Sequence, residues 1–267
     1  MPLSKLYTAT SLASPELLQF PGVDLVVCTR VSPTLAHVNE DGVLVLDFAE
    51  QTLVVAVADG AGGYPDGGSA SALALAALDA ACHGEGELQA RAAILNGFEA
   101  AHQAIKDHGA GGATTLAVIE VVADTLRTYH AGDSGILVVG QRGRVKLQSV
   151  FHSPTGYAVE AGLLDEEEAL HHEHRHMVSN LLGMEPMSVA IGSPITLARR
   201  DTVVIASDGL YDNLYVPEII EIVRKGPLLD SCWTLVDTAC ARMLAAAPGQ
   251  PSKPDDLSVV LLRRAAD

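Results

Sequence analysis

The sequence predicts an α+β fold in which antiparallel sheets carry helices on their outer faces. Apolar runs rich in Val, Ile and Thr recur along the chain, and helical apolar spacing appears in blocks between groups of these runs. Strands and helices do not alternate strictly, as they would in a doubly wound parallel sheet. No internal repeat or long low-complexity linker is present, so we expect one domain over residues 1–267.

The expected strands are continuous apolar runs, which is typical of strands buried in a core. They lie at 23–31, 42–48, 52–58, 114–122, 125–130, 135–139, 144–150, 202–207 and 257–262.

Helices are expected at 68–82, 88–108, 216–224 and 229–247. The first is rich in Ala, which lets a helix lie close to a sheet, so we interpret its surface as core packing rather than a partner site. Between about 151 and 195 the periodicity weakens and charged residues gather, which predicts a flap-like excursion from the core.

The amino-acid composition argues against several classes of function. The formal net charge is −16, from 33 acidic and 17 basic residues, which opposes binding to nucleic acid or to anionic membranes. Neither an apolar stretch of about 18 residues nor a secretory signal is present, so we expect a cytoplasmic protein. The four cysteines have no Cys-x-x-Cys spacing, which favours free thiols; they are Cys28, Cys82, Cys232 and Cys240.

Two of the apolar runs end in Asp-Gly, at Asp59-Gly60 and Asp208-Gly209. Asp-Gly is a common turn dipeptide, so either one alone is most simply a turn. A carboxylate at the end of a buried strand nevertheless needs a partner that offsets its desolvation, and a metal ion is such a partner. Asp41, Asp133 and Asp255 also border apolar runs, which extends the candidate set.

Four carboxylates in one pocket would repel one another strongly. Two divalent ions would balance the formal charges of Asp41, Asp59, Asp208 and Asp255, and all-oxygen ligation favours Mg²⁺ or Mn²⁺ over zinc. The glycine-rich run 60–68 lacks the Gly-Lys-[Ser/Thr] of a P-loop, so its glycines more plausibly bring backbone close to a metal, with the Gly60 carbonyl as a candidate ligand.

The motifs together carry a family resemblance. In chain order they are Asn39-Glu40-Asp41, Val57-Ala58-Asp59-Gly60-Ala61-Gly62-Gly63 with Ser69-Ala70-Ser71, Gly112-Ala113-Thr114-Thr115, Gly132-Asp133-Ser134, His152-Ser153, Ala206-Ser207-Asp208-Gly209-Leu210 and Asp255-Asp256-Leu257-Ser258-Val259. With this order and spacing the chain resembles a PPM-type metal-dependent protein phosphatase (protein phosphatase 2C family) in its short single-domain prokaryotic form. The resemblance covers most of the chain.

The resemblance implies a four-layer αββα sandwich of two antiparallel sheets, with a metal site at one edge. Asp59 would bridge two ions, and Glu40 is a lesser candidate ligand. The remaining ligands that the resemblance assigns are Asp208 and Asp255 on the first ion, the Gly60 carbonyl and Asp41 on the second, and Asp133 with Asp208 on a weaker third.

The implied chemistry is hydrolysis of phosphoserine and phosphothreonine in proteins by a metal-activated water, with Asp59, Asp208 and Asp255 as the catalytic set. The implied partners are phosphoproteins and a cognate Ser/Thr kinase, and we expect a monomer. Two alternatives stay open: a catalytically weak regulatory module that binds phosphoproteins, and a metal phosphohydrolase that acts on small phosphorylated metabolites.

The chain departs from the family pattern at three positions. Ala36 stands where members usually carry a phosphate-binding arginine, so Arg30 or His37 would have to contact the phosphate instead. Gly135 replaces a frequent arginine, and Ala61 stands where animal members have a histidine proposed as general acid. The change at Ala36 predicts weakened phosphate binding, seen mainly as a raised KM. The change at Ala61 leaves the leaving group to be protonated by water or by another residue.

The histidine-rich run 171–176 could suggest a zinc site. His172 and His176 have i,i+4 spacing, but Glu173 is not placed as in a His-Glu-x-x-His metalloprotease helix. We therefore interpret this run as a solvated part of the flap.

Overall fold

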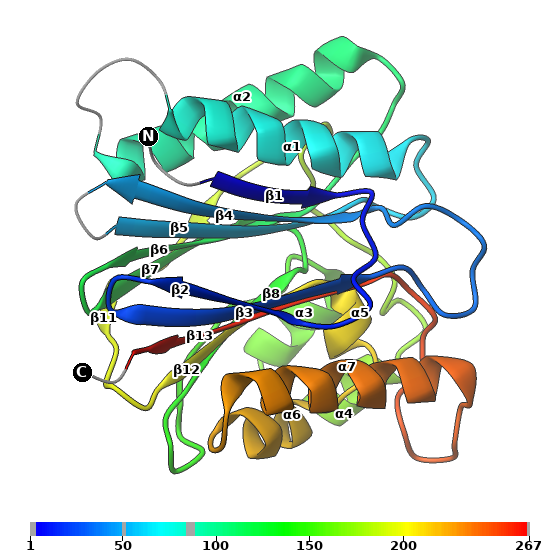
Figure 1. Ribbon diagram of the computed structural model, residues 1–267. Coiled ribbons are helices and arrows are strands. Elements are labelled where there is room, and N and C mark those ends of the chain that lie inside the picture. Colours follow the sequence, from blue (N-terminus) through cyan, green and yellow to red (C-terminus); the bar gives the residue numbers. More distant parts are fainter. Residues whose placement is uncertain (1–3, 50–51, 84–88, 266–267) are drawn as a thin grey trace.

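Two antiparallel sheets pack face to face in the computed structural model, which describes residues 4–49, 52–83 and 89–265 (Figure 1). In the first sheet the strand order is β1-β4-β5-β6-β7-β10, and β11 also pairs with β7. Its strands are β1 (Ser4–Thr8), β4 (Asp41–Ala49), β5 (Thr52–Asp59), β6 (Leu116–Val122), β7 (Thr125–Ala131), β10 (Ala190–Ile191) and β11 (Ile195–Thr196).

The second sheet has the order β2-β3-β13-β12-β8-β9, and all of its pairings are antiparallel. Its strands are β2 (Glu16–Phe20), β3 (Val23–Arg30), β8 (Gly135–Val139), β9 (Val145–Gln148), β12 (Thr202–Ala206) and β13 (Leu257–Arg264). The predicted antiparallel sheets are therefore confirmed.

The alternation of side chains along each strand explains why the strand sequences are apolar at successive positions. In β4, Val43 and Val45 face the core between the sheets, whereas Leu44 and Leu46 face the helices that cover the first sheet. Because both faces of the central strands are covered, all four side chains are fully buried.

Helices form the two outer layers, as predicted. The long pair α1 (Gly67–Cys82) and α2 (Ala90–His108) covers the first sheet, and α5 (Asp208–Tyr211), α6 (Val216–Val223) and α7 (Leu228–Leu244) lie beside the second (Figure 1). The Ala-rich sequence of α1 serves this packing, because Ala70 and Ala74 are buried against the sheet.

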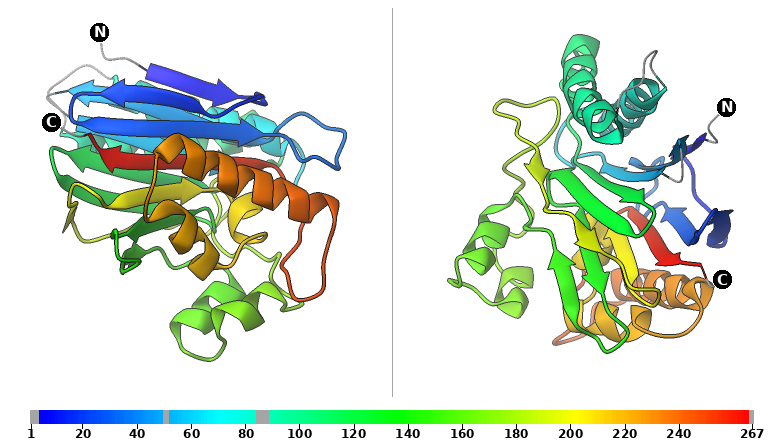
Figure 2. Two further views of the ribbon diagram at one scale, coloured as in Figure 1. Left: turned by 60° about the horizontal axis from the view of Figure 1, so that its bottom comes forward. Right: turned by 90° about the vertical axis from the view of Figure 1, so that its left-hand side faces the viewer.

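Residues 151–189 leave the sandwich and carry two short helices, α3 (Pro154–Glu160) and α4 (Glu166–Leu170), before β10 rejoins the first sheet. Both lie to one side of the two sheets (Figure 2). Ser153 caps α3, and a capping box between Asp165 and Glu168 starts α4. Five to seven residues are too few for a visible helical period, so sequence periodicity missed them.

Sequence reasoning also missed β1 and β2. Both contain exposed and half-buried positions, because each lies at the edge of its sheet. They therefore lack the continuous apolar run that identified the central strands. Among the described residues, no helix is long and apolar enough to cross a membrane.

Candidate metal centre

The candidate acids meet because antiparallel strands begin and end at a shared edge of the sandwich. Asp41 opens β4 directly opposite Asp59, which ends β5. In the other sheet the end of β12 pairs with the start of β13, so that Ala206 faces Val259. Asp208 follows β12 and Asp255 precedes β13, so these two acids lie side by side at the same edge.

Ser207 joins the two halves of the cluster. Its hydroxyl donates a hydrogen bond to Asp41 Oδ2 over 2.8 Å, and it accepts one from the Ser258 backbone amide over 2.9 Å. Asp41 belongs to the first sheet, whereas Ser207 and Ser258 belong to the second. This fully buried serine therefore fixes the position of one sheet's carboxylate relative to the other sheet.

Asp59 and Gly60 are held by the segment before β6. The Asp59 amide donates to Thr115 Oγ1 over 3.1 Å, and its carbonyl accepts from the hydroxyl of Thr114 over 2.8 Å. A Cβ on Gly60 would lie 2.5 Å from the carbonyl carbon and oxygen of Gly67 at the start of α1. Only glycine allows this close approach of strand and helix directly after Asp59.

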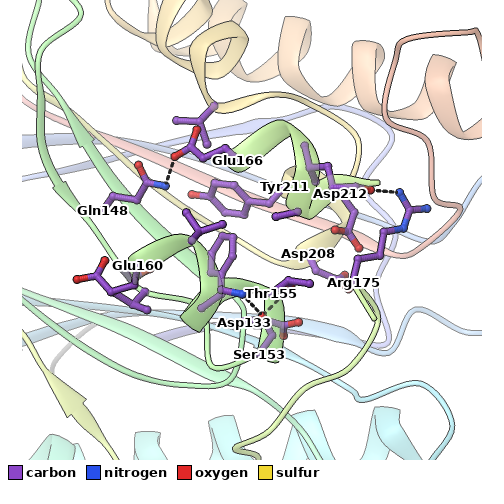
Figure 3. A pocket seen from close by; sticks show the side chains of 18 of the residues that line it. Asp133, Gln148, Ser153, Thr155, Glu160, Glu166, Arg175, Asp208, Tyr211 and Asp212 are labelled. Carbon is purple, nitrogen blue, oxygen red and sulfur yellow. Dashed lines mark hydrogen bonds between the residues drawn. The ribbon is translucent and has the colours of Figure 1, made fainter. Parts of the chain in front are cut away.

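Asp133 comes from the turn between β7 and β8. It lines a cavity of about 290 Å³ together with Asp208 and Asp212, and the flap helices form the other side of this cavity (Figure 3). Phe151 and Leu170 are among its apolar lining residues. Of the candidate ligands, Asp133 and Asp208 line this largely apolar chamber beneath the flap.

Burial and mutual repulsion perturb these acids in one direction. Burial, followed by the charges of Asp208 and Asp41, raises the pKa of Asp59 well above its usual range. Burial also raises the pKa of Asp41. For Asp133 and Asp255, burial and the nearby Asp208 raise the pKa to about 8 and about 6. In the absence of a metal ion, burial therefore favours the protonated forms of Asp41, Asp59 and Asp133.

Lys253 supplies a cation to this cluster. Its ammonium lies 2.5 Å from Asp208 Oδ2, 2.9 Å from Asp212 Oδ2 and 3.1 Å from Asp255 Oδ2. Burial alone would lower the pKa of Lys253, but the three carboxylates raise it above its ordinary value. Sequence reasoning missed Lys253 and Asp212, although Lys253 is only two residues from Asp255 in the chain.

The donor set fits a hard divalent cation. All candidate side-chain ligands are carboxylates, and Oδ1 of the buried Asp41 has no hydrogen-bond partner among the described residues. Within those residues, no group of three carboxylate, imidazole or thiol side chains is already arranged around a single metal position. The ammonium of Lys253 lies between Asp208 and Asp255, where the first ion would bind.

The two candidate phosphate ligands lie in different surroundings. The Arg30 guanidinium donates to the carbonyls of Leu12 and Ala13 and lies over the Trp233 ring at 5.0 Å, so it packs against α7. His37 Nε2 is 3.0 Å from the carboxylate of Asp256, the neighbour of Asp255. The structure thus brings His37 towards the cluster and leaves Arg30 outside it.

The departure at Gly135 has a steric reason. A Cβ there would lie 2.4 Å from Cε2 of Tyr211 and 2.8 Å from Cε1 of Phe151, so no larger side chain fits.

Glu40, the lesser candidate ligand, accepts a hydrogen bond over 3.3 Å from the Gly68 amide in the first turn of α1. In the flap, the rings of His172 and His174 are 5.4 Å apart.

Comparisons with known proteins identify the family of the chain. The model of the family "Protein phosphatase 2C" matches residues 36–244. A putative protein phosphatase 2C-type from Streptococcus pyogenes serotype M6 is 30% identical over 201 residues, which cover 72% of this chain and 81% of that protein.

Solved structures match the whole sandwich. The S. agalactiae serine/threonine phosphatase is 25% identical, with a TM-score of 0.77 over 91% of this chain and 100% of that one. The catalytic domain of the serine/threonine protein phosphatase PstP, in complex with 2 manganese ions, has a TM-score of 0.72 at 23% identity over 91% and 99% of the two chains. The chain belongs to the protein phosphatase 2C family.

Proposed function

We propose that this protein is a Mg²⁺- or Mn²⁺-dependent phosphatase that hydrolyses phosphoserine and phosphothreonine in proteins. The observation that carries the proposal is the convergence of Asp41, Asp59, Asp133, Asp208 and Asp255 from both sheets on one edge. Carboxylates lie this close together in a folded protein where a cation offsets their mutual repulsion. Family membership and the manganese ions reported for PstP support the same function.

In this proposal Asp59, Asp208 and Asp255 would hold the first ion, Asp59, Asp41 and the Gly60 carbonyl would hold the second, and Asp133 would hold a weaker third together with Asp208. When bound, the ions supply an activated water and stabilise the charge that develops on the phosphoryl group.

The chain's own contribution is positioning. Ser207 holds Asp41, and Thr115 holds the backbone of Asp59, so the two acids keep their geometry without moving at the moment of reaction. Preorganised acids of this kind need no reorganisation when the charge on the phosphoryl group develops.

The chamber beneath the flap supports a protein substrate. Its volume of about 290 Å³ and its lining by Phe151, Val159 and Leu170 suit an apolar side chain next to the phosphorylated residue. A small phosphate that carries no apolar group would leave this part of the chamber empty. We therefore expect a phosphopeptide to compete better than small phosphates.

A second candidate, the catalytically weak regulatory module, is favoured by one observation. No arginine stands at Ala36, and Arg30 donates to the carbonyls of Leu12 and Ala13 away from the acids. This module would bind phosphoproteins with little turnover.

As a phosphatase, the protein would oppose a Ser/Thr kinase, and we propose that it acts as a monomer.

The test is turnover of p-nitrophenyl phosphate with Mn²⁺, with and without chelator, for the native chain, Asp59→Asn and the control Asp107→Asn. Asp107 is exposed at the end of α2, where it accepts a hydrogen bond from Gln103 of the same helix. We expect metal-dependent turnover that Asp59→Asn abolishes and Asp107→Asn leaves intact. Turnover that needs neither metal nor Asp59 would refute the enzyme proposal.

Substrate class is tested separately, by competition. Phosphothreonine and phosphoserine peptides should inhibit p-nitrophenyl phosphate turnover at lower concentration than glucose 6-phosphate or inorganic phosphate. Equal or stronger inhibition by the small phosphates would favour the metabolite phosphohydrolase instead.

A further inference from the structure

The position of Lys253 gives the metal centre an unusual feature. Its ammonium touches both carboxylates of the proposed first ion, Asp208 and Asp255, and also touches Asp212. The side chain is about one-fifth exposed, at 22%. An ammonium at this place uses the oxygen lone pairs that a divalent ion would need.

Hydrogen bonds with Asn213 hold the backbone of Lys253 in place. The lysine side chain therefore starts from a fixed point beside the carboxylates, unlike that of a free surface lysine. Its amide donates to Asn213 Oδ1 over 2.9 Å, and its carbonyl accepts from Asn213 Nδ2 over 2.8 Å. Asn213 is fully buried and also donates to the Gly209 carbonyl over 2.9 Å. One buried amide therefore ties the Lys253 backbone to the helix that begins with Asp208.

We propose that Lys253 is a tethered cation that competes with a divalent ion for Asp208 and Asp255, and that metal entry moves its ammonium onto Asp212 alone. The inference rests on the proposed metal-dependent function. Asp212 is outside the ligand set that the family resemblance assigns, so it remains available to pair with the displaced ammonium. The three carboxylates carry three negative charges, which one ammonium neutralises only in part.

The competition has two opposite consequences for removal of the lysine. The metal-free protein loses the cation that offsets three buried or half-buried carboxylates, so its melting temperature should fall. At the same time the carboxylates become free for the metal, so affinity should rise. A lysine with only a structural role would lower stability without raising metal affinity.

The experiment measures Mn²⁺ binding to the chelator-treated, full-length protein by isothermal titration calorimetry, with bound ions counted by the EPR signal of free Mn²⁺. The variants are Lys253→Met, Lys253→Gln and the charge-preserving Lys253→Arg. Lys146→Met is the matched control, because Lys146 makes a comparable 2.5 Å contact with Asp201 at the opposite end of β12 from Asp208. Its removal changes net charge equally but leaves the cluster alone.

For Lys253→Met we expect the Kd of the Mn²⁺ ion proposed to be held by Asp208 and Asp255 to fall by at least about tenfold, or one further ion to bind. The metal-free melting temperature should fall as well. Lys253→Gln should behave in the same way and covers the case in which Lys253→Met fails to fold. Lys253→Arg and Lys146→Met should keep the native affinity within about threefold.

Equal affinity and stoichiometry in the native chain and both uncharged variants would overturn this inference. If that result came with Mn²⁺ binding that Asp59→Asn abolishes, the proposed function would stand and only the role of Lys253 would fall. Absence of Mn²⁺ binding in the native chain and in every variant would overturn both. Binding gained only in the uncharged variants would support the competition in its strongest form.

Discussion

Gly209→Ala tests whether the approach of two chain segments sets the geometry of the metal centre. Gly209 follows Asp208, and a Cβ at this position would lie 1.9 Å from the carbonyl oxygen of Asp256. Ordinary van der Waals contact begins at 3.4 Å, so the segments must separate by about 1.5 Å to accept one methyl group. They carry Asp208 on one side and Asp255 on the other.

The displacement should affect activity more than stability. A misplacement of about 1 Å can cost about 100-fold in rate, because the acids no longer present their oxygens together. Overpacking of this size typically costs about 1–3 kcal/mol in the free energy of unfolding. We therefore expect kcat/KM to fall by about 100-fold or more in a chain that still folds.

The assay is p-nitrophenyl phosphate turnover at saturating Mn²⁺, together with urea unfolding followed by circular dichroism. Gly62→Ala is the matched control, because it adds the same methyl group in the neighbouring Gly-rich loop where nothing lies within 4 Å. It should change kcat/KM by less than about threefold. Native turnover and stability in Gly209→Ala would refute the reasoning, because the two segments could then separate at no cost.

Three further predictions concern the surroundings of the cluster. The pKa of Asp133 is raised to about 8, so its contribution to stability is present at low pH and is lost as pH rises through about 8. The melting temperature of the metal-free protein should therefore fall between pH 6.5 and 8.5, and it should fall less in Asp133→Asn. A flat profile in the native chain would contradict this. His37→Ala should raise KM for a phosphopeptide with little change in kcat. Arg30→Ala should leave KM unchanged and lower the melting temperature. The reverse pattern would assign the phosphate contact to Arg30. Ser207→Ala should lower the free energy of unfolding by about 1–3 kcal/mol and weaken Mn²⁺ binding, because Asp41 loses its buried hydrogen-bond donor. Urea unfolding and calorimetry measure the two effects. Unchanged Mn²⁺ binding would show that Ser207 does not position Asp41.

Much of the fold could be predicted because its central strands carry a strong local signal. β5 is apolar at every position from Leu53 to Ala58, since one face packs on the other sheet and the other face packs on helices. The edge strands β1 and β2 lack this signal, and the flap helices are too short for a helical period. Local pattern therefore identified the core and missed the periphery.

The acids of the candidate site could be predicted for a related reason. A carboxylate that ends a buried strand stands out in the sequence, as at Asp59 and Asp208. Their meeting follows from antiparallel pairing, which places the end of one strand beside the start of the next. The candidate acids and their grouping at one edge could therefore be predicted before the structure.

By itself, the sequence determined the αββα class, the set of strand-ending acids and the family of the protein, because each depends on residues close in the chain or on motif order. Only the tertiary structure decided that Lys253 contacts Asp208, that Arg30 faces α7 and that Gly135 has no room for a side chain. Lys253 and Asp208 are 45 residues apart in the chain. Contacts of this kind depend on how the sheet, helix and loop pack together, and no local periodicity records that packing.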